Sequence, residues 1–153
     1  MGQIHVHRIN LMEAFLIETL RGDRVSNTEL LDRTYKKEIE EWQNLYPELD
    51  FQGLVTLADK DFGAFKSIIQ DGYKIKFVTM NGLKNLLKLR FTITENEYNQ
   101  SEKGIEKVKV NNEQLSWIEQ ILSGNWRIKE TLLEKNEDQG KYINILLAEE
   151  IGK

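Results

Sequence analysis

Positive charge in this chain is concentrated between residues 66 and 94, where six Lys or Arg stand against one Asp, a net charge of +5. The flanks are acidic, with a net charge of −5 over residues 1–65 and −4 over residues 95–153. Cationic side chains bind phosphate groups and gain free energy from counterion release on nucleic acids. Beside Lys66, the anion- or nucleic-acid-binding candidates are therefore Lys74, Lys76, Asn81, Gly82, Lys84, Lys88 and Arg90.

A phosphate site is one form that this chemistry could take. Residues 79–82, Thr-Met-Asn-Gly, join a predicted strand end to a predicted helix start, where free N–H groups and the helix dipole favour anions. Lys84 and Lys88, one helical turn apart, would reinforce it. However, the segment has no Walker motif or glycine triplet. A pI near 5.3 and the acidic flanks also oppose a polyanion, so anion binding stays an alternative.

The sequence gives little support to metal-dependent or other enzymatic chemistry. His5 and His7 share one face of a short alternating run, but the chain has no cysteine and indicates no carboxylate as a third metal ligand. Carboxylates that could converge are Asp59, Asp61, Glu95, Glu97 and Glu130, a coincidence that is easily found among 25 acidic residues. We therefore expect no metal, no cofactor and a non-enzymatic role.

Aromatic side chains favour binding to a protein, because they dominate the energetics of protein interfaces. The chain has three Trp and five Tyr, and most of them fall on predicted inner faces of helices, including Tyr35 and Trp42. Trp117 lies beside the apolar stripe of its helix, which makes it the protein-interface candidate. The leading hypothesis is a small soluble regulatory or adaptor-type domain that binds a protein partner. Binding of nucleic acid or a phosphate ligand through the basic 66–90 segment is the alternative.

Two helices are predicted in the first third of the chain. Asn10 caps a helix that runs to about residue 20, with Met12, Phe15, Leu16 and Leu20 inside, and Gly22 follows it. A second helix is predicted over 26–45, from a Ser26–Glu29 capping box to the turn before Pro47. Its predicted inner face consists of Leu31, Tyr35, Ile39, Trp42 and Leu45. Together they predict an N-terminal helical hairpin.

A strand–helix–strand unit is predicted next. The apolar run 54–57 favours a buried strand, and Asp59 or Asp61 caps a helix that ends at Gly72. The alternation of 73–79 predicts a second strand, which would lie parallel to the first. Leu83, Leu86 and Leu87 fit a short helix capped by Thr79 or Asn81, and the alternation returns over 88–94 as a third strand. A bulged hairpin at Asn81-Gly82 is the alternative for this region.

For the last third of the chain the sequence predicts, in order, a loop, a strand, a helix and two further strands. Residues 95–104 lack periodicity and are the one candidate for a mobile loop, and 105–110 predict a poor strand at a sheet edge. Asn111 and Gln114 form a capping box before a helix that buries Leu115, Ile118, Ile121 and Leu122 and stops at Gly124. A strand from Trp126 toward Leu133, a turn through 136–140 and a strand over 143–147 predict an antiparallel hairpin.

Length and composition limit the architecture. At 153 residues the chain matches the common size of one domain, so we expect 1–153 to form a single α+β domain, with 1–9 flexible or extended. Its helical hairpin would pack on a mixed sheet of about five or six strands, with two or three additional helices. The chain has no cysteine and no long apolar run, so we expect a soluble protein in the cytoplasm without a membrane anchor.

Overall fold

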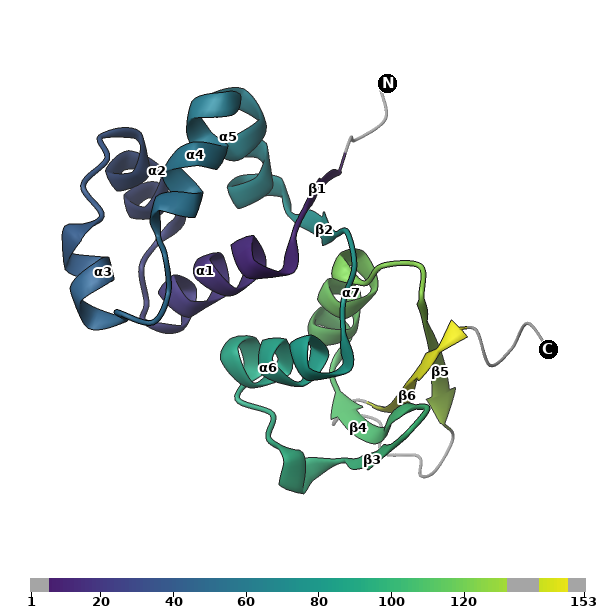
Figure 1. Ribbon diagram of the computed structural model, residues 1–153. Coiled ribbons are helices and arrows are strands. Elements are labelled where there is room, and N and C mark those ends of the chain that lie inside the picture. Colours follow the sequence, from purple (N-terminus) through teal and green to yellow (C-terminus); the bar gives the residue numbers. More distant parts are fainter. Residues whose placement is uncertain (1–5, 132–140, 149–153) are drawn as a thin grey trace. The chain divides into compact units, whose positions relative to one another are not determined.

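The computed structural model describes residues 6–131 and 141–148 and has a mixed α+β fold (Figure 1). The chain divides into two compact units, the N-terminal unit, Met1–Lys74, and the C-terminal unit, Ile75–Lys153. The single-domain organisation stays a prediction, and each unit is described by itself. Within the described ranges, no helix is both long and apolar enough to cross a membrane.

The N-terminal unit is mainly helical. Its helices α2, α4 and α5 pack against one another, α1 contacts α4, and α5 contacts β1. Strands β1 and β2 pair as a parallel two-stranded sheet. In chain order the elements are β1 (His7–Ile9), α1 (Leu11–Gly22), α2 (Asn27–Tyr35), α3 (Glu40–Leu45), α4 (Gln52–Lys60), α5 (Phe62–Asp71) and β2 (Tyr73–Ile75).

Helix α1 begins as predicted. The Asn10 side chain accepts from the Glu13 N–H at 2.7 Å, and the Glu13 carboxylate accepts from the Asn10 N–H at 2.9 Å. Leu16 and Leu20 are buried, but Met12 is 51% exposed, so its predicted inward position is wrong. The buried face is set by α4, because a Cβ at Gly53 would lie 3.3 Å from Leu16 Cδ1.

The predicted helix over 26–45 is wrong, because the chain breaks between α2 and α3. Lys37 adopts a left-handed φ of 61°. The Glu38 N–H donates to the Arg33 carbonyl at 2.8 Å and the Lys37 N–H to the Thr34 carbonyl at 3.0 Å, which is the bonding of a Schellman motif. After the break Trp42 is buried as predicted, but Leu45, predicted on the same inner face, is 60% exposed.

A buried carboxylate joins three elements of the N-terminal unit. Glu18 on α1 accepts from the Tyr73 hydroxyl of β2 at 2.6 Å and from Arg21 Nη1 at 3.0 Å. Arg21 Nη2 also donates to the Ile69 carbonyl of α5 at 2.6 Å. Because a buried charge is costly unless it is paired, these bonds fix the positions of α1, α5 and β2.

The strand predicted over 54–57 is also wrong, since these residues belong to α4. Leu54, Val55 and Ala58 are buried at helical spacing, and a short apolar run does not by itself distinguish a helix from a strand. The predicted parallel pairing of 54–57 with 73–79 is therefore wrong as well, and β2 pairs with β1 instead. The next prediction is confirmed: the Asp61 side chain accepts from the Ala64 N–H at 3.1 Å and caps α5, which ends at Gly72 with a φ of 107°.

The C-terminal unit places two helices on an antiparallel sheet. The sheet has the strand order β3-β4-β6-β5, and Figure 1 shows α6 and α7 on the same side of it. In chain order the elements are α6 (Met80–Phe91), the 3₁₀ turn η1 (Glu95–Glu97), β3 (Asn99–Ser101), β4 (Gly104–Val110), α7 (Asn112–Ile121), β5 (Trp126–Thr131) and β6 (Lys141–Leu147).

The central stretch departs from its predicted strand–helix–strand pattern. Strand β2 ends at Ile75 instead of continuing to residue 79, and Phe77 is 59% exposed. Thr79 caps α6 as predicted, but the helix continues to Phe91, so both the strand predicted over 88–94 and the alternative bulged hairpin are wrong. Thr92, with a left-handed φ of 61°, ends the helix.

Strand β4 lies inside the sheet, between β3 and β6, so its predicted edge position is wrong. Part of the predicted mobile loop over 95–104 forms η1 and β3, and β3 covers the edge. A bulge between Ile105 and Val108 brings both side chains to the buried face although they are three residues apart. This irregular spacing is the reason that the strand pattern is weak in the sequence.

The end of the fold agrees with the sequence. Asn111 and Gln114 form the predicted capping box of α7, and Leu115, Ile118 and Ile121 are buried, although the helix ends at Ile121 instead of Gly124. Strand β5 pairs antiparallel with β6 as predicted, while Leu132, Leu133 and the turn over 136–140 lie outside the described residues. The α+β class is confirmed, but the strands form two sheets rather than one, and the described residues contain seven α-helices. The N-terminal helical hairpin stays a prediction.

Candidate functional site

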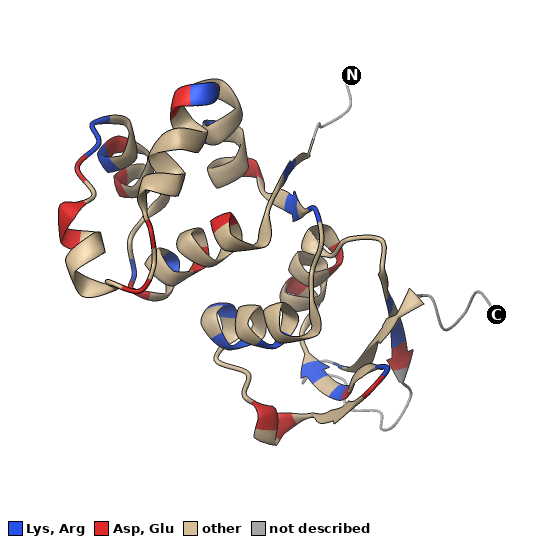
Figure 2. Ribbon diagram, viewed as in Figure 1, with Lys and Arg blue, Asp and Glu red and all other residues tan. Residues whose placement is uncertain are grey.

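The predicted basic candidates are divided between the two units. Lys66 and Lys74 belong to the N-terminal unit, whereas Lys76, Lys84, Lys88 and Arg90 belong to the C-terminal unit. Figure 2 shows the Lys and Arg residues on α6 among those of other elements. The six cations are close in sequence, but they do not all lie on one unit.

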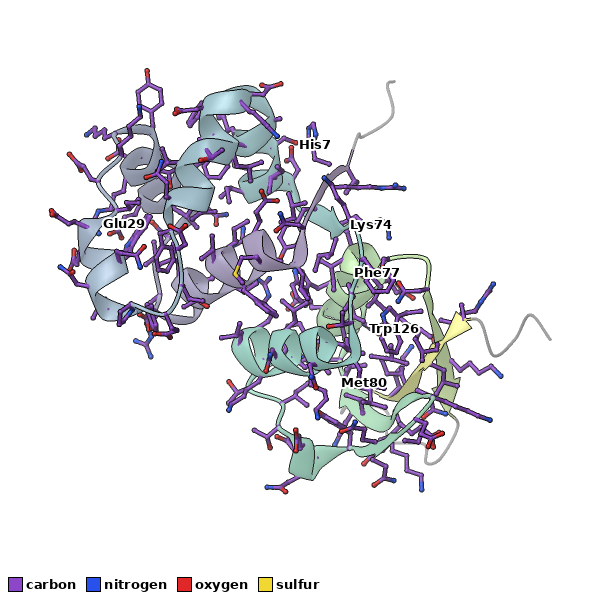
Figure 3. The ribbon with its side chains drawn as sticks, in the orientation of Figure 1. His7, Glu29, Lys74, Phe77, Met80 and Trp126 are labelled. Atoms are coloured by element: carbon purple, nitrogen blue, oxygen red, sulfur yellow. The ribbon has the colours of Figure 1, made fainter. Side chains whose placement is uncertain are left out.

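Lys74 lies half-buried on β2, and Figure 3 labels it together with His7 of β1. Burial lowers the pKa of its ammonium, and the positive charge of Arg8 lowers it further. Lys76, two residues later, is exposed. The two lysines that alternate in the sequence thus have different surroundings.

The start of α6 is where a phosphate site was predicted. The Thr79 hydroxyl accepts from the Gly82 N–H at 3.0 Å, so the helix satisfies one of its own free donors. Gly82 is buried and Asn81 is exposed. This geometry is that of an ordinary N-cap and gives no independent sign of an anion.

Lys84 and Lys88 line a hollow of about 400 Å³ that is bounded by the segment after α6. Lys84 Nζ lies 2.8 Å from a Glu95 carboxylate oxygen and donates to Gln100 Oε1 at 2.9 Å. The hydrogen bond from Lys84 lowers the pKa of Glu95, and the same bond raises the pKa of Lys84. The charge of Lys84 is thus already balanced within the unit.

Arg90 and Trp117 contact each other, which the sequence did not predict. The Arg90 guanidinium carbon lies 5.1 Å from the Trp117 ring centroid, and the Phe91 ring packs edge-on against Trp117 at 5.3 Å. Trp117 is half-buried, although its position beside the apolar stripe of its helix predicts an exposed side chain. Trp117 is a weaker interface candidate than its place beside the apolar stripe indicated.

The most exposed aromatic side chain among the described residues is Tyr35, at the end of α2, with 67% of its surface accessible. Its ring meets Phe62, the first residue of α5, edge-on at 5.0 Å between centroids. The two rings border a mostly apolar hollow of about 340 Å³, which we call the Tyr35 hollow. Its lining residues are Thr28, Leu31, Asp32, Tyr35, Phe62, Lys66 and Gln70.

The charges around the Tyr35 hollow are unequal. Asp32 forms an ion pair with Lys36 at 3.3 Å. Lys66 is exposed on α5 and makes no ion pair within residues 6–131 and 141–148. The hollow therefore combines exposed aromatic surface with one uncompensated positive charge.

A wider depression of about 870 Å³ lies on the same unit, and its lining contains two cations and four carboxylates, an excess of negative charge. Arg33 lies 2.9 Å from a Glu41 oxygen and 3.3 Å from a Glu29 oxygen, and Lys37 lies 3.7 Å from an Asp59 oxygen. The hydrogen bond to Glu41 raises the pKa of Arg33. These pairs close the turn between α2 and α3.

The described residues contain no group of three His, Asp or Glu side chains that could hold a metal ion. His5 lies outside the described residues, and His7 lies on β1. Three of the carboxylates considered for catalysis have separate local roles: Asp59 pairs with Lys37, Asp61 caps α5, and Glu130 pairs with Lys141 at 3.4 Å.

Comparisons of the chain with protein-family models, with curated proteins and with solved structures found no match. The site must therefore be judged from its own chemistry. Sequence reasoning missed Tyr35 because an uninterrupted helix over 26–45 places it on the inner stripe. The one signal that could have warned of this is the polar run from Lys36 to Glu38, which interrupts the apolar spacing.

Proposed function

We propose that this protein is a small, non-enzymatic regulatory or adaptor-type domain that acts by binding a protein partner. The observation that carries the proposal is the exposed Tyr35 side chain at the rim of an apolar hollow. The cytoplasmic location expected from the cysteine-free sequence is part of the same proposal.

The aromatic rim supports this role on energetic grounds. Tyrosine is among the residues that most often dominate protein interfaces, since it contributes a large contact area at a low cost in side-chain entropy. Tyr35 is already restrained by Phe62, so less freedom is lost when a partner covers it. A volume of about 340 Å³ is sufficient for one or two large side chains.

The charge at the hollow specifies the chemistry of the partner. Because Lys66 is the uncompensated charge and Asp32 is paired with Lys36, a complementary segment presents a large apolar side chain beside a carboxylate. The occupant that we propose is therefore an apolar, acidic segment of another protein.

Nucleic-acid or phosphate binding through the basic 66–90 segment remains the alternative, with less support. Lys84 is paired with Glu95, and Arg90 lies against Trp117. The exposed cations of the C-terminal part of this segment, Lys76 and Lys88, carry the remaining charge.

The test begins with a photo-crosslinking amino acid at position 35 in the full chain, produced in its native cells, and identifies the protein that it captures. Binding is then measured with that partner purified. Tyr35→Ala should weaken binding about 30-fold, or about 2 kcal/mol, as is typical of an interface hot spot. Lys66→Glu should weaken it as well, and a carboxylate-to-lysine change in the partner should restore it.

The matched control is Leu45→Ala, because Leu45 is 60% exposed on α3 of the same unit but does not line the hollow. This variant should bind like the original chain. The proposal is wrong if position 35 captures no stoichiometric partner, or if Tyr35→Ala and Leu45→Ala have equal effects on affinity.

A further inference from the structure

The sheet of the C-terminal unit has one face that neither α6 nor α7 covers (Figure 1). Residues directly opposite each other in neighbouring strands share a face, so the strand register identifies the side chains on it. Lys109 lies opposite Tyr142, Asn144 opposite Lys129, and Leu146 opposite Arg127. We call this surface the outer sheet face.

Burial confirms that these side chains point away from the core. Lys109 is exposed between the buried Val108 and Val110, and Arg127 is exposed beside the buried Trp126. On the central strand β6, the buried Ile143 and Ile145 alternate with Tyr142, Asn144 and Leu146, which are half-buried.

The bulge in β4 adds a fourth cation. Lys107, with a φ of 60°, is exposed, and its N–H donates to Asn144 Oδ1 at 2.9 Å. This bond fixes Asn144 on the outer sheet face and brings Lys107 beside it. The bulge therefore buries Ile105 and Val108 on one side and presents a lysine on the other.

In the part of the chain that the structure describes, Lys107, Lys109, Arg127 and Lys129 form no ion pair. The acidic residues of β4, β5 and β6 are Glu106, in the bulge, and Glu130, whose carboxylate pairs with Lys141. Residues 75–153 contain twelve Lys or Arg and twelve Asp or Glu, so this unit has no net charge. The excess of positive charge on the outer sheet face therefore reflects where the cations are placed.

An aromatic ring lies among these charges. Tyr142 is on a central strand, directly opposite Lys109, with Lys129 diagonal to it across β5. Proteins that bind single-stranded nucleic acids combine such parts: aromatic rings on which bases stack and cations that contact the phosphates.

We infer that the outer sheet face binds single-stranded nucleic acid, with a base stacked on Tyr142 and phosphates held by Lys107, Lys109, Arg127 and Lys129. The uncompensated charge selects a polyanion, and the half-buried ring beside it selects a strand whose bases are unpaired. The inference is independent of the proposed protein partner, which concerns the Tyr35 hollow of the other unit.

The test is fluorescence anisotropy of a labelled twelve-nucleotide oligo(dT) or oligo(U) with the full chain, at several salt concentrations. Four phosphate contacts predict that the logarithm of affinity falls with the logarithm of salt concentration with a slope of about −3. The double variant Lys109→Gln/Lys129→Gln should reduce this slope by about 1.4 and weaken binding. Tyr142→Ala should weaken binding about tenfold, whereas Tyr142→Phe should retain it.

The matched control is Lys76→Gln/Lys88→Gln, which removes two exposed charges from the same unit but outside the sheet. It should leave affinity nearly unchanged. The Tyr142 variants could lose binding through a folding defect. The Lys109→Gln/Lys129→Gln variant avoids this problem, because both lysines are exposed and contribute little to the core.

Four outcomes would overturn the inference. The first is no binding of the oligonucleotide at 50 mM salt, and the second is an equal loss in the sheet and control variants. The third is double-stranded DNA binding as tightly as the single strand. The fourth is competition by poly-glutamate as effective as competition by the unlabelled oligonucleotide, which would assign the face to acidic polypeptides.

Discussion

Single hydrogen bonds between buried polar groups restrain the chain at positions that the apolar pattern of the sequence does not predict. Glu18 lies on the buried side of α1, and its carboxylate accepts from Tyr73 and Arg21. In the C-terminal unit, the Val78 carbonyl accepts from the Trp126 indole at 2.7 Å, and the Ser123 hydroxyl accepts from the Val78 N–H at 3.0 Å. Buried polar groups of this kind are costly unless each is paired, so they specify one arrangement of the elements around them.

The contact between Tyr46 and Asp23 makes a prediction about pH. The Tyr46 hydroxyl donates to the Asp23 carboxylate at 2.5 Å, and this bond, together with burial, raises the pKa of Tyr46 to about 12. Since the unfolded value is near 10, the contribution to stability is complete below pH 10 and is lost as the pH rises through 12. NMR titration of ¹³C-labelled tyrosine rings should show a phenol that ionises near pH 12, in addition to Tyr98, whose pKa is raised by burial.

The variant Asp23→Asn identifies that phenol. Without the carboxylate, the pKa of Tyr46 should return toward 10, and the signal that moves between the two proteins belongs to Tyr46. An unchanged titration of every tyrosine in the variant would contradict the assigned cause.

Backbone conformation decides where the helices end. Lys37 and Thr92 both adopt a left-handed φ of 61° after α2 and α6, at positions where glycine is the usual residue. A β-branched residue is especially unfavourable there, because its Cβ substituents crowd the backbone. The exposed Thr92 therefore holds α6 to its length at a local cost in stability.

Thr92→Gly should raise the free energy of unfolding by about 1 kcal/mol, since glycine adopts a left-handed conformation without steric cost. Urea unfolding followed by circular dichroism measures the change. Thr94→Gly is the matched control: Thr94 has an extended φ of −106° and its hydroxyl contacts Glu97, so glycine there should destabilise the chain. A loss of stability in Thr92→Gly would show that the Thr92 side chain makes a contribution beyond its backbone strain.

Each compact unit of the whole molecule has a core of its own. Leu54 and Phe65 are completely buried among the helices of the N-terminal unit, and Ile118 and Ile145 are completely buried between helix and sheet in the C-terminal unit. A chain with two such cores is one cooperative domain if the unfolding of one core also unfolds the other. It is two domains if each core can unfold alone.

The single-domain prediction is tested by a matched pair of core variants, Leu54→Ala and Ile118→Ala. Each should cost about 2–5 kcal/mol, because it leaves a cavity at a fully buried position. If the chain is one cooperative domain, hydrogen exchange should show the most protected amides of both units losing protection equally in either variant. Loss confined to the mutated unit would divide the chain into two domains.

The sequence by itself determined the features that depend on neighbouring residues. The caps at Asn10, Thr79 and Asn111, the end of α5 at Gly72 and the pairing of β5 with β6 follow from side chains a few positions apart. Local hydrogen bonds and alternation are enough to specify them. For the same reason the α+β class was predictable.

The tertiary structure alone decided the features in which distant residues compete. It placed 54–57 in a helix, continued α6 through an alternating stretch and put β4 inside the sheet, since burial against other elements outweighs local propensity. The same competition sets both proposed surfaces. Helix α2 buries Leu30 and Thr34 and leaves Tyr35 exposed, and the bulge and register of β4, β5 and β6 place four cations on the face that carries Tyr142. No spacing within one segment brings those residues together, because they come from three separate strands.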